Sequence, residues 1–248
     1  MQNISLSELL NSPEYKTSKA VLPIILGNTN NKLSIQDLCK MPHLLIGGAA
    51  GAGKTMFLKS VIHNIQNKYS TKECEIIVLN PKGIDFEKHV DSATVINDID
   101  DCMQTLHNTV EEMDNRYTLL LKSGTKNITE YNQQNPANKL PFHIVLIDEI
   151  STMISFFGKT VEQNIIQLAE KARATGIHLI ITSNYFDKIS SQFKAYFPVR
   201  MAFWVAAKKE SVKILGEPGA EKLATQYEVL FSDAGRIPIL IHTPYMEE

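Results

Sequence analysis

The sequence has few of the residues that build disulfide frameworks and metal sites. Only three cysteines occur among its 248 residues, namely Cys39, Cys74 and Cys102. Their odd number and wide spacing argue against a disulfide framework and a zinc motif, so we expect reduced thiols in the cytosol. The seven histidines show no spacing typical of metal ligands.

Long hydrophobic runs and an excess of one charge are also missing. No apolar stretch approaches the roughly 20 residues that span a bilayer, and the N-terminus lacks the parts of a signal peptide. With 25 basic and 27 acidic residues, the formal net charge is −2, which gives no bulk electrostatic argument for binding nucleic acid. We therefore expect a soluble cytoplasmic protein, placed at the inner face of a membrane only through a membrane-anchored recruiter.

A glycine-rich segment that follows an apolar run is the most informative feature present. It reads Gly48-Ala49-Ala50-Gly51-Ala52-Gly53-Lys54-Thr55 and fits the phosphate-loop pattern G-x-x-x-x-G-K-[ST]. In such a loop, backbone N–H groups and the start of a helix face the phosphates of a nucleotide. The pattern assigns Lys54 to the β- and γ-phosphates and the Thr55 hydroxyl to Mg²⁺. We expect the nucleotide-binding segment to extend through Met56.

A second apolar run, residues 142–147, ends in Asp148 and Glu149. In a nucleotide hydrolase Asp148 would hold Mg²⁺, while Glu149 would orient and polarise the attacking water. The same pattern also fits a helix that begins with acids against its dipole; the phosphate loop upstream favours hydrolysis. After a third run, Asn184 would sense the γ-phosphate or position water, and it fits a turn or helix cap equally well.

Apolar runs alternate with helical patterns along the chain, which predicts an α/β fold with a mainly parallel central sheet covered by helices on both faces. Apolar residues recur at spacings of three and four between Asp98 and Ser123, so a helix with one core-facing stripe is expected there. Residues 6–10 predict a short helix, 21–26 an extended segment, and the polar stretch 127–141 a surface loop. The predicted strands are 43–46, 75–79, 142–147, 178–182 and 201–205. We expect a single domain over residues 1–248, with a lead-in over 1–40 and the core over 41–248.

In these motifs the sequence resembles the motor domain of the FtsK/SpoIIIE family, hexameric RecA-like ATPases that pump double-stranded DNA. The most specific match, residues 168–179, is close to the family signature K-A-R-A-x-G-I-H-L. Further matching stretches are 5–10, 22–27, 40–45, 80–82, 112–117, 131–132 and 219–223. The resemblance implies a RecA-like P-loop NTPase fold, ATP and Mg²⁺ as cofactors, a homo-hexamer, and duplex DNA bound without reading its sequence.

The sequence departs from the family pattern at two places. After the His-Leu strand the family usually has A-T-Q-R-P, whereas residues 182–186 of this chain read T-S-N-Y-F, with Asn184 at the glutamine position and Tyr185 at the arginine position. Where the family carries S-R-x-I-L, residues 211–215 read S-V-K-I-L, so the arginine that acts on a neighbour's nucleotide is absent. Lys213 or Arg200 is the candidate replacement for this arginine finger.

The function expected first is an ATP-dependent double-stranded DNA translocase with Lys54, Glu149 and Asn184 as catalytic residues. The chain contains no winged-helix module that reads oriented DNA, so DNA transfer by a plasmid, conjugative element or phage is expected before chromosome partition. Two alternatives stay open. One is the ATPase of a protein-secretion system of the same family, and the other is a nucleotide-dependent assembly module with weak hydrolysis.

Overall fold

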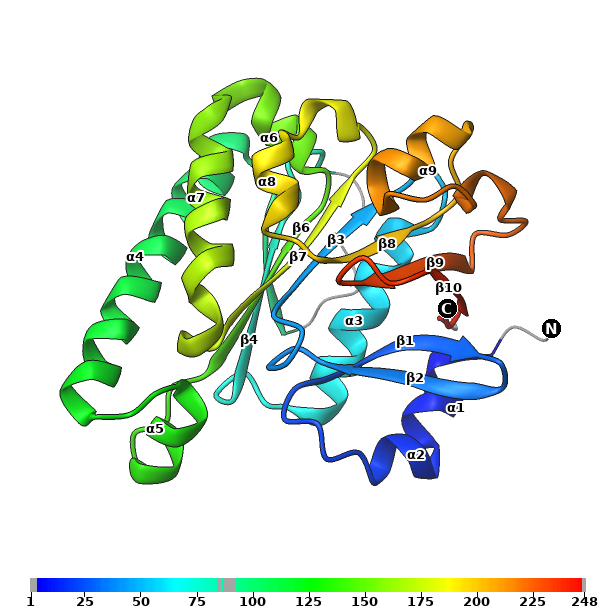
Figure 1. The fold of residues 1–248 in the computed structure, drawn as a ribbon. Coiled ribbons are helices and arrows are strands. Elements are labelled where there is room, and N and C mark those ends of the chain that lie inside the picture. The colour runs from blue at the N-terminus through cyan, green and yellow to red at the C-terminus, as the bar shows by residue number, and fades with distance from the viewer. Residues whose placement is uncertain (1–3, 84–85, 87–91, 247–248) are drawn as a thin grey trace.

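In the computed structural model, ten strands of the described residues (4–83, 86 and 92–246) form one sheet in the order β2-β1-β10-β9-β8-β3-β7-β6-β4-β5 (Figure 1). The strands are β1 (Pro23–Thr29), β2 (Lys32–Asp37), β3 (His43–Gly47), β4 (Cys74–Leu79), β5 (Ala93–Ile96), β6 (Phe142–Ile147), β7 (Ile177–Ser183), β8 (Val199–Ala202), β9 (Glu228–Asp233) and β10 (Ile239–His242). The α-helices are α1 (Leu6–Asn11), α2 (Pro13–Lys16), α3 (Lys54–Lys68), α4 (Ile99–Ser123), α5 (Ile128–Gln134), α6 (Ile150–Phe157), α7 (Lys159–Lys171), α8 (Ser191–Ala195) and α9 (Lys208–Leu215). The 3-10 helices are η1 (Ala172–Thr175), η2 (Phe186–Lys188) and η3 (Ala220–Lys222).

The sheet has a parallel half and an antiparallel half. Strands β8, β3, β7, β6, β4 and β5 run parallel to one another, whereas β9 pairs antiparallel with both β8 and β10, and β1 pairs antiparallel with both β10 and β2. The central strands β3 and β7 are buried along their whole length, as expected for apolar strands covered on both faces. All the carboxyl ends of the parallel strands therefore meet at one edge.

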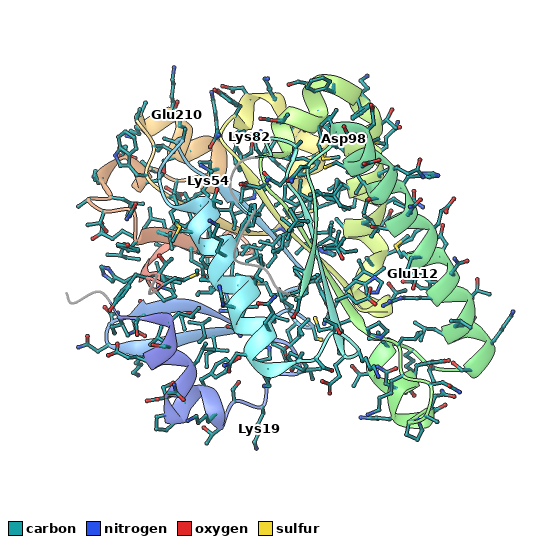
Figure 2. The ribbon with its side chains drawn as sticks, turned by 180° about the vertical axis from the view of Figure 1, so that it is seen from behind. Lys19, Lys54, Lys82, Asp98, Glu112 and Glu210 are labelled. Atoms are coloured by element: carbon teal, nitrogen blue, oxygen red, sulfur yellow. The ribbon has the colours of Figure 1, made fainter. Side chains whose placement is uncertain are left out.

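Helices cover both faces of the sheet, which confirms the predicted fold class. On one face Leu45 and Leu179 pack against α4 and α7; on the other, Leu44 and Ile180 pack against α3. Figure 2 shows α3 on this second face. Each of these fully buried side chains contributes roughly 1.5–3 kcal/mol to folding. No helix in the described part of the chain is long and apolar enough to cross a membrane.

Helix α4 carries the predicted apolar stripe and a buried arginine within it. Leu106 and Met113 are fully buried in the core, as the spacing indicated. The Arg116 guanidinium donates to the carboxylate of Glu112, to the backbone carbonyls of Pro141 and Thr175, and to Nε2 of His143. Burial and the adjacent Arg116 lower the pKa of His143 to about 3, so the imidazole accepts this bond in its neutral form. Arg116 thus ties α4 to the start of β6 and the end of η1.

Two local predictions are corrected by the structure. Residues 127–141 are not wholly a loop, because α5 lies within them: the Asn127 side chain accepts a hydrogen bond from the Glu130 amide and caps the helix. The strand predicted at 201–205 is β8, which begins at Val199 and ends at Ala202. The short helix and the extended segment near the N-terminus are confirmed as α1 and β1.

Candidate active site

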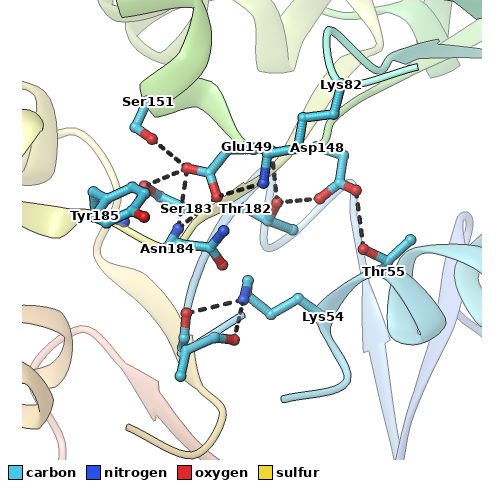
Figure 3. A network of polar contacts seen from close by, with 12 residues as sticks. Lys54, Thr55, Lys82, Asp148, Glu149, Ser151, Thr182, Ser183, Asn184 and Tyr185 are labelled. Atoms are coloured by element: carbon cyan, nitrogen blue, oxygen red, sulfur yellow. Dashed lines mark hydrogen bonds and ion pairs between the residues drawn. The ribbon is translucent and has the colours of Figure 1, made fainter. Parts of the chain in front are cut away.

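The sequence-predicted site residues meet at the edge where the parallel strands end. β3 leads through the phosphate loop into α3, Asp148 and Glu149 directly follow β6, and Asn184 directly follows β7 (Figure 3). A cleft of about 340 Å³ lies between them. It is lined by Ala50, Gly51, Gly53, Lys54, Thr55, Met56, Lys59, Lys82, Asp148, Glu149, Asn184 and Gln226. The topology therefore builds one site from motifs that lie far apart in the sequence, with Thr55 and Asp148 separated by 93 residues.

Two glycines of the phosphate loop are required by close packing. A Cβ atom on Gly48 would lie 2.8 Å from Cβ of Phe203, and one on Gly53 would lie 2.3 Å from the Gln226 carbonyl oxygen. Gly53 also has a φ of +108°, which side-chain-bearing residues rarely adopt. The chain then enters α3 at Lys54, so that the helix N-terminus and its free N–H groups face the cleft, as a phosphate requires.

Lys54 is folded back on the phosphate loop. Its Nζ donates to the carbonyl oxygens of Gly48 at 2.9 Å and Ala49 at 2.7 Å, and only 6% of the residue is exposed. Burial lowers the pKa of Lys54 to about 8, and the carboxylates of Glu149 and Asp148 oppose that shift. A bound polyphosphate would supply the anion that this buried ammonium lacks.

Asp148 is held by hydroxyl groups on two sides. Thr55 Oγ1 donates to one carboxylate oxygen at 2.9 Å, and Thr182 Oγ1 donates to the other at 2.6 Å. No group of three or more His, Cys, Asp or Glu residues in the described part of the chain could hold a metal. Mg²⁺ usually takes one or two protein oxygens and completes its shell with phosphate and water. The adjacent Thr55 hydroxyl and Asp148 carboxylate fit that requirement.

Glu149 is 2% exposed and its carboxylate is fully engaged. It accepts hydrogen bonds from the hydroxyls of Ser151 and Ser183 and, at 2.9 Å, from the Asn184 amide, while Lys82 Nζ lies 3.3 Å from Oε2. Its backbone has a φ of +67°, and its own amide donates to Thr182. This uncommon conformation turns the side chain toward the end of β7 rather than leaving it in α6.

Asn184 contacts Glu149 through its backbone and faces the cleft with its side chain. The Oδ1 atom of Asn184 is buried without a hydrogen-bond partner among the described residues. Such an oxygen favours a ligand or water as its partner. The following Tyr185 is 60% exposed, and Lys188 Nζ lies 5.4 Å from its ring centroid.

The two candidates for the missing arginine differ in their contacts. Arg200 donates to the backbone carbonyls of Phe197, Ile214 and Lys194, which occupy its guanidinium. Lys213 makes an exposed ion pair with Asp187, with Nζ and carboxylate oxygen 2.6 Å apart. Of the two, Lys213 holds the more accessible charge.

Some predicted residues lie outside the main cleft, and other residues there were missed. Gly48 and Ala49 line an adjoining pocket of about 250 Å³, and Ala52 is buried beneath the loop. Lys82 and Thr182 had no predicted role, although residues 80–82 are one of the stretches that match the family. Both stand where a parallel strand ends or has just ended, and that position is the signal that could have identified them.

A phosphate loop between a parallel strand and a helix, facing a strand that ends in Asp148 and Glu149, defines the class of P-loop ATPases. Within that class, the FtsK/SpoIIIE family model matches residues 5–191, and the chain belongs to this family. The resemblance recognised in the sequence is thereby confirmed.

Relatives of known name match the whole chain. The DNA translocase FtsK of Campylobacter jejuni subsp. jejuni serotype O:2 is 36% identical over 259 residues, covering 100% of this chain and 27% of that protein. The DNA translocase FtsK of Pseudomonas syringae pv. syringae is 32% identical over 280 residues, covering 100% and 35%. The chain thus spans about a third of the length of these relatives.

Solved structures agree on the fold. The pCW3 conjugation coupling protein TcpA, a monomer form with ATPγS, superposes with a TM-score of 0.85 at 26% identity, covering 95% of this chain and 69% of that one. The cytoplasmic domain of the Thermomonospora curvata type VII secretion ATPase EccC gives 0.81 at 18% identity, covering 99% and 32%. The latter likeness supports the fold alone.

Proposed function

We propose that this chain is a motor domain that couples ATP hydrolysis to the movement of double-stranded DNA. The observation that carries the proposal is the single cleft in which Lys54, Thr55, Asp148 and Glu149 converge. The relatives named DNA translocases support the choice of substrate, and the similarity to a conjugation coupling protein supports a role in conjugative or plasmid DNA transfer.

In this proposal each cleft residue has one task. Residues 48–56 bind the phosphates, and Lys54 neutralises charge on the β- and γ-phosphates. Thr55 and Asp148 hold Mg²⁺, and Asn184 orients the attacking water. Glu149 accepts a proton from that water while the water oxygen bonds to the γ-phosphorus and the bond from the γ-phosphorus to the β–γ bridging oxygen breaks.

DNA contact and assembly form the next part of the proposal. The chain acts in the cytoplasm as a homo-hexamer, in which a few cations from each subunit track the phosphate backbone despite the net charge of −2. Lys213 serves as the cation that reaches the neighbour's nucleotide. A membrane-anchored partner positions the ring, and residues 1–248 form one domain.

The test is steady-state ATP hydrolysis with and without long linear duplex DNA, using Glu149→Gln as control. We expect stimulation that grows with DNA length and is lost in the variant. Hydrolysis that responds to peptide substrates but not to duplex DNA would favour a secretion ATPase. ATP binding and oligomerisation with no hydrolysis in either protein would favour an assembly module.

A further inference from the structure

A lysine to which the sequence assigned no role enters the cleft from the turn after the neighbouring strand. Lys82 stands in the turn after β4, where the Gly83 amide donates to the Asn80 carbonyl at 2.9 Å. The turn is anchored to the end of β5, because Asn80 Nδ2 donates to Asn97 Oδ1 at 3.0 Å. Since β4 pairs with β6, the turn brings the Lys82 side chain beside Glu149.

The Lys82 ammonium pairs with the carboxylate proposed to activate water. Its Nζ lies 3.3 Å from Glu149 Oε2; the Lys82 side chain is 40% exposed, whereas that of Glu149 is 2% exposed. The Glu149 carboxylate is thus buried and fixed, while the Lys82 ammonium can move on its flexible side chain. Figure 3 shows Lys82 and Lys54 reaching the same space from different sides.

Glu149 cannot take a proton from water in this arrangement. Its two oxygens already accept from Ser151, Ser183 and the Asn184 amide, and Lys82 occupies a further position on Oε2. Ser151 lies in α6, and Ser183 and Asn184 lie at or just after the end of β7, where short side chains and a backbone amide make the contacts. Lys82 is the donor on a long, 40% exposed side chain, so its departure is the simplest way to free a lone pair.

A bound triphosphate would compete for the same ammonium. Lys82 lines the cleft together with the phosphate loop. The terminal phosphate of a bound nucleotide would therefore be a second anion near the Lys82 ammonium, besides the Glu149 carboxylate. Phosphate oxygens carry more charge than a single carboxylate and accept strong charge-assisted hydrogen bonds.

We propose that Lys82 is a positioning residue that moves from Glu149 to the terminal phosphate when a nucleoside triphosphate binds. Glu149 is then freed to receive the proton of the attacking water only when there is a γ-phosphate to attack. The inference rests on the role proposed above for Glu149 and is independent of whether DNA is the cargo.

The first test compares affinities for ADP and for the slowly hydrolysed analogue ATPγS in the full chain. Lys82→Met should weaken ATPγS binding about 10-fold or more, the usual effect of one charged hydrogen bond, and leave ADP binding unchanged. Lys82→Arg should restore most of the lost affinity for ATPγS. Lys59→Met removes another lysine of the same cleft and should change both affinities by the same factor. Equal effects of Lys82→Met on both nucleotides would overturn the proposal.

A double-mutant cycle on thermal unfolding tests the movement itself. Lys82→Met, Glu149→Gln and the double variant should show coupling without nucleotide, because the pair is intact. The coupling should vanish with saturating ATPγS. Coupling that persists unchanged would overturn the proposal, since Lys82 would then stay on Glu149.

Hydrolysis rates separate this inference from the role of Glu149. If Glu149→Gln keeps normal hydrolysis, the proposed role of Glu149 fails and this inference fails with it. If Glu149→Gln is inactive while Lys82→Met retains wild-type kcat and KM, the Glu149 assignment stands and the Lys82 inference alone is wrong. We expect Lys82→Met to raise KM by about 10-fold or more, matching its weaker hold on the terminal phosphate.

Discussion

The two ends of the central parallel strands carry different kinds of buried polar group. Near their amino ends β3, β6 and β7 hold His43, His143 and His178, whose pKa values burial lowers to about 3, 3 and 4. At the carboxyl ends of the same strands lie the phosphate loop, the acid pair and Asn184.

The amino-terminal groups mostly hold one another in place. Arg116 donates to four acceptors there, His43 Nδ1 accepts the Leu179 amide, and His178 Nδ1 donates to the Pro42 carbonyl. Both ends contain buried atoms without a hydrogen-bond partner among the described residues, namely Nε2 of His43 and of His178 at the amino ends and Oδ1 of Asn184 at the carboxyl ends. At the carboxyl ends, however, these groups line a cleft, and Lys54 bends back onto carbonyls of the loop. One end is arranged for stability and the other for a ligand.

The largest expected effect is acid destabilisation at the amino ends. The three histidines have folded-state pKa values well below their ordinary 6.5, so below pH 6.5 the unfolded chain binds protons that the folded chain refuses. The unfolding free energy that depends on these histidines staying neutral is fully present above pH 6.5. It is lost as the pH falls toward 4, at up to about 1.4 kcal/mol per pH unit for each histidine. Urea unfolding across pH 4.5–7.5 measures the slope.

A matched pair of variants assigns that slope. His178→Asn should reduce the slope by about one proton, because it removes one buried histidine. The Asn amide can still donate to the Pro42 carbonyl, so the hydrogen bond is kept. His107→Asn removes an exposed histidine paired with Glu111 and should leave the slope unchanged. A slope equal in both variants would contradict the assignment to buried histidines.

Removing the arginine at the amino-terminal end should affect stability more than function. Arg116→Met leaves buried carbonyls and His143 without their donor and should cost about 3 kcal/mol or more of unfolding free energy. The ATP affinity of the folded protein should stay the same. Arg236→Met, at an 80% exposed side chain, is the control and should stay within about 0.5 kcal/mol of wild type. A loss of ATP affinity in Arg116→Met would mean that the two ends are coupled.

The reverse pattern is expected at the carboxyl ends. Glu149→Gln should lower the hydrolysis rate by about 100-fold or more, because the amide cannot accept the water's proton. Its ATP affinity should stay close to wild type. Single-turnover hydrolysis and calorimetric ATP binding measure the two quantities. Retained hydrolysis would place the proton acceptor elsewhere.

The smallest expected effect concerns the helix that was predicted as loop. Asn127→Ala removes the cap of α5 and should cost about 1 kcal/mol, with no change in hydrolysis. Asn127→Ser should recover most of it. Equal stability of all three proteins in urea would show that the cap contributes nothing.

The sequence predicted the parts of the molecule that depend on local pattern. Strands β3, β4, β6 and β7 are largely continuous apolar runs, the phosphate loop has a fixed spacing, and α4, 25 residues long, repeats its apolar residues along one face, whereas the short β5 was not predicted. These patterns are strong predictors because an apolar run between turn residues, or a long apolar repeat of helical period, is compatible with few other structures.

The missed parts depend on partners far along the chain. β2 and β9 mix polar and apolar residues, and α5 is only seven residues long with polar surroundings. Lys82 gained a role only when the pairing of β4 with β6 placed it beside Glu149. No spacing within the sequence encodes that distance.

The contact between Gly53 and the Gln226 carbonyl has a consequence for engineering. The eight residues of the phosphate loop cannot be replaced freely, because Gly53 packs against the backbone of the segment that leads into the antiparallel half of the sheet. A chimera that exchanges residues 48–55 with another loop must therefore keep a glycine at position 53. A side chain there would collide with the Gln226 carbonyl before any nucleotide arrives.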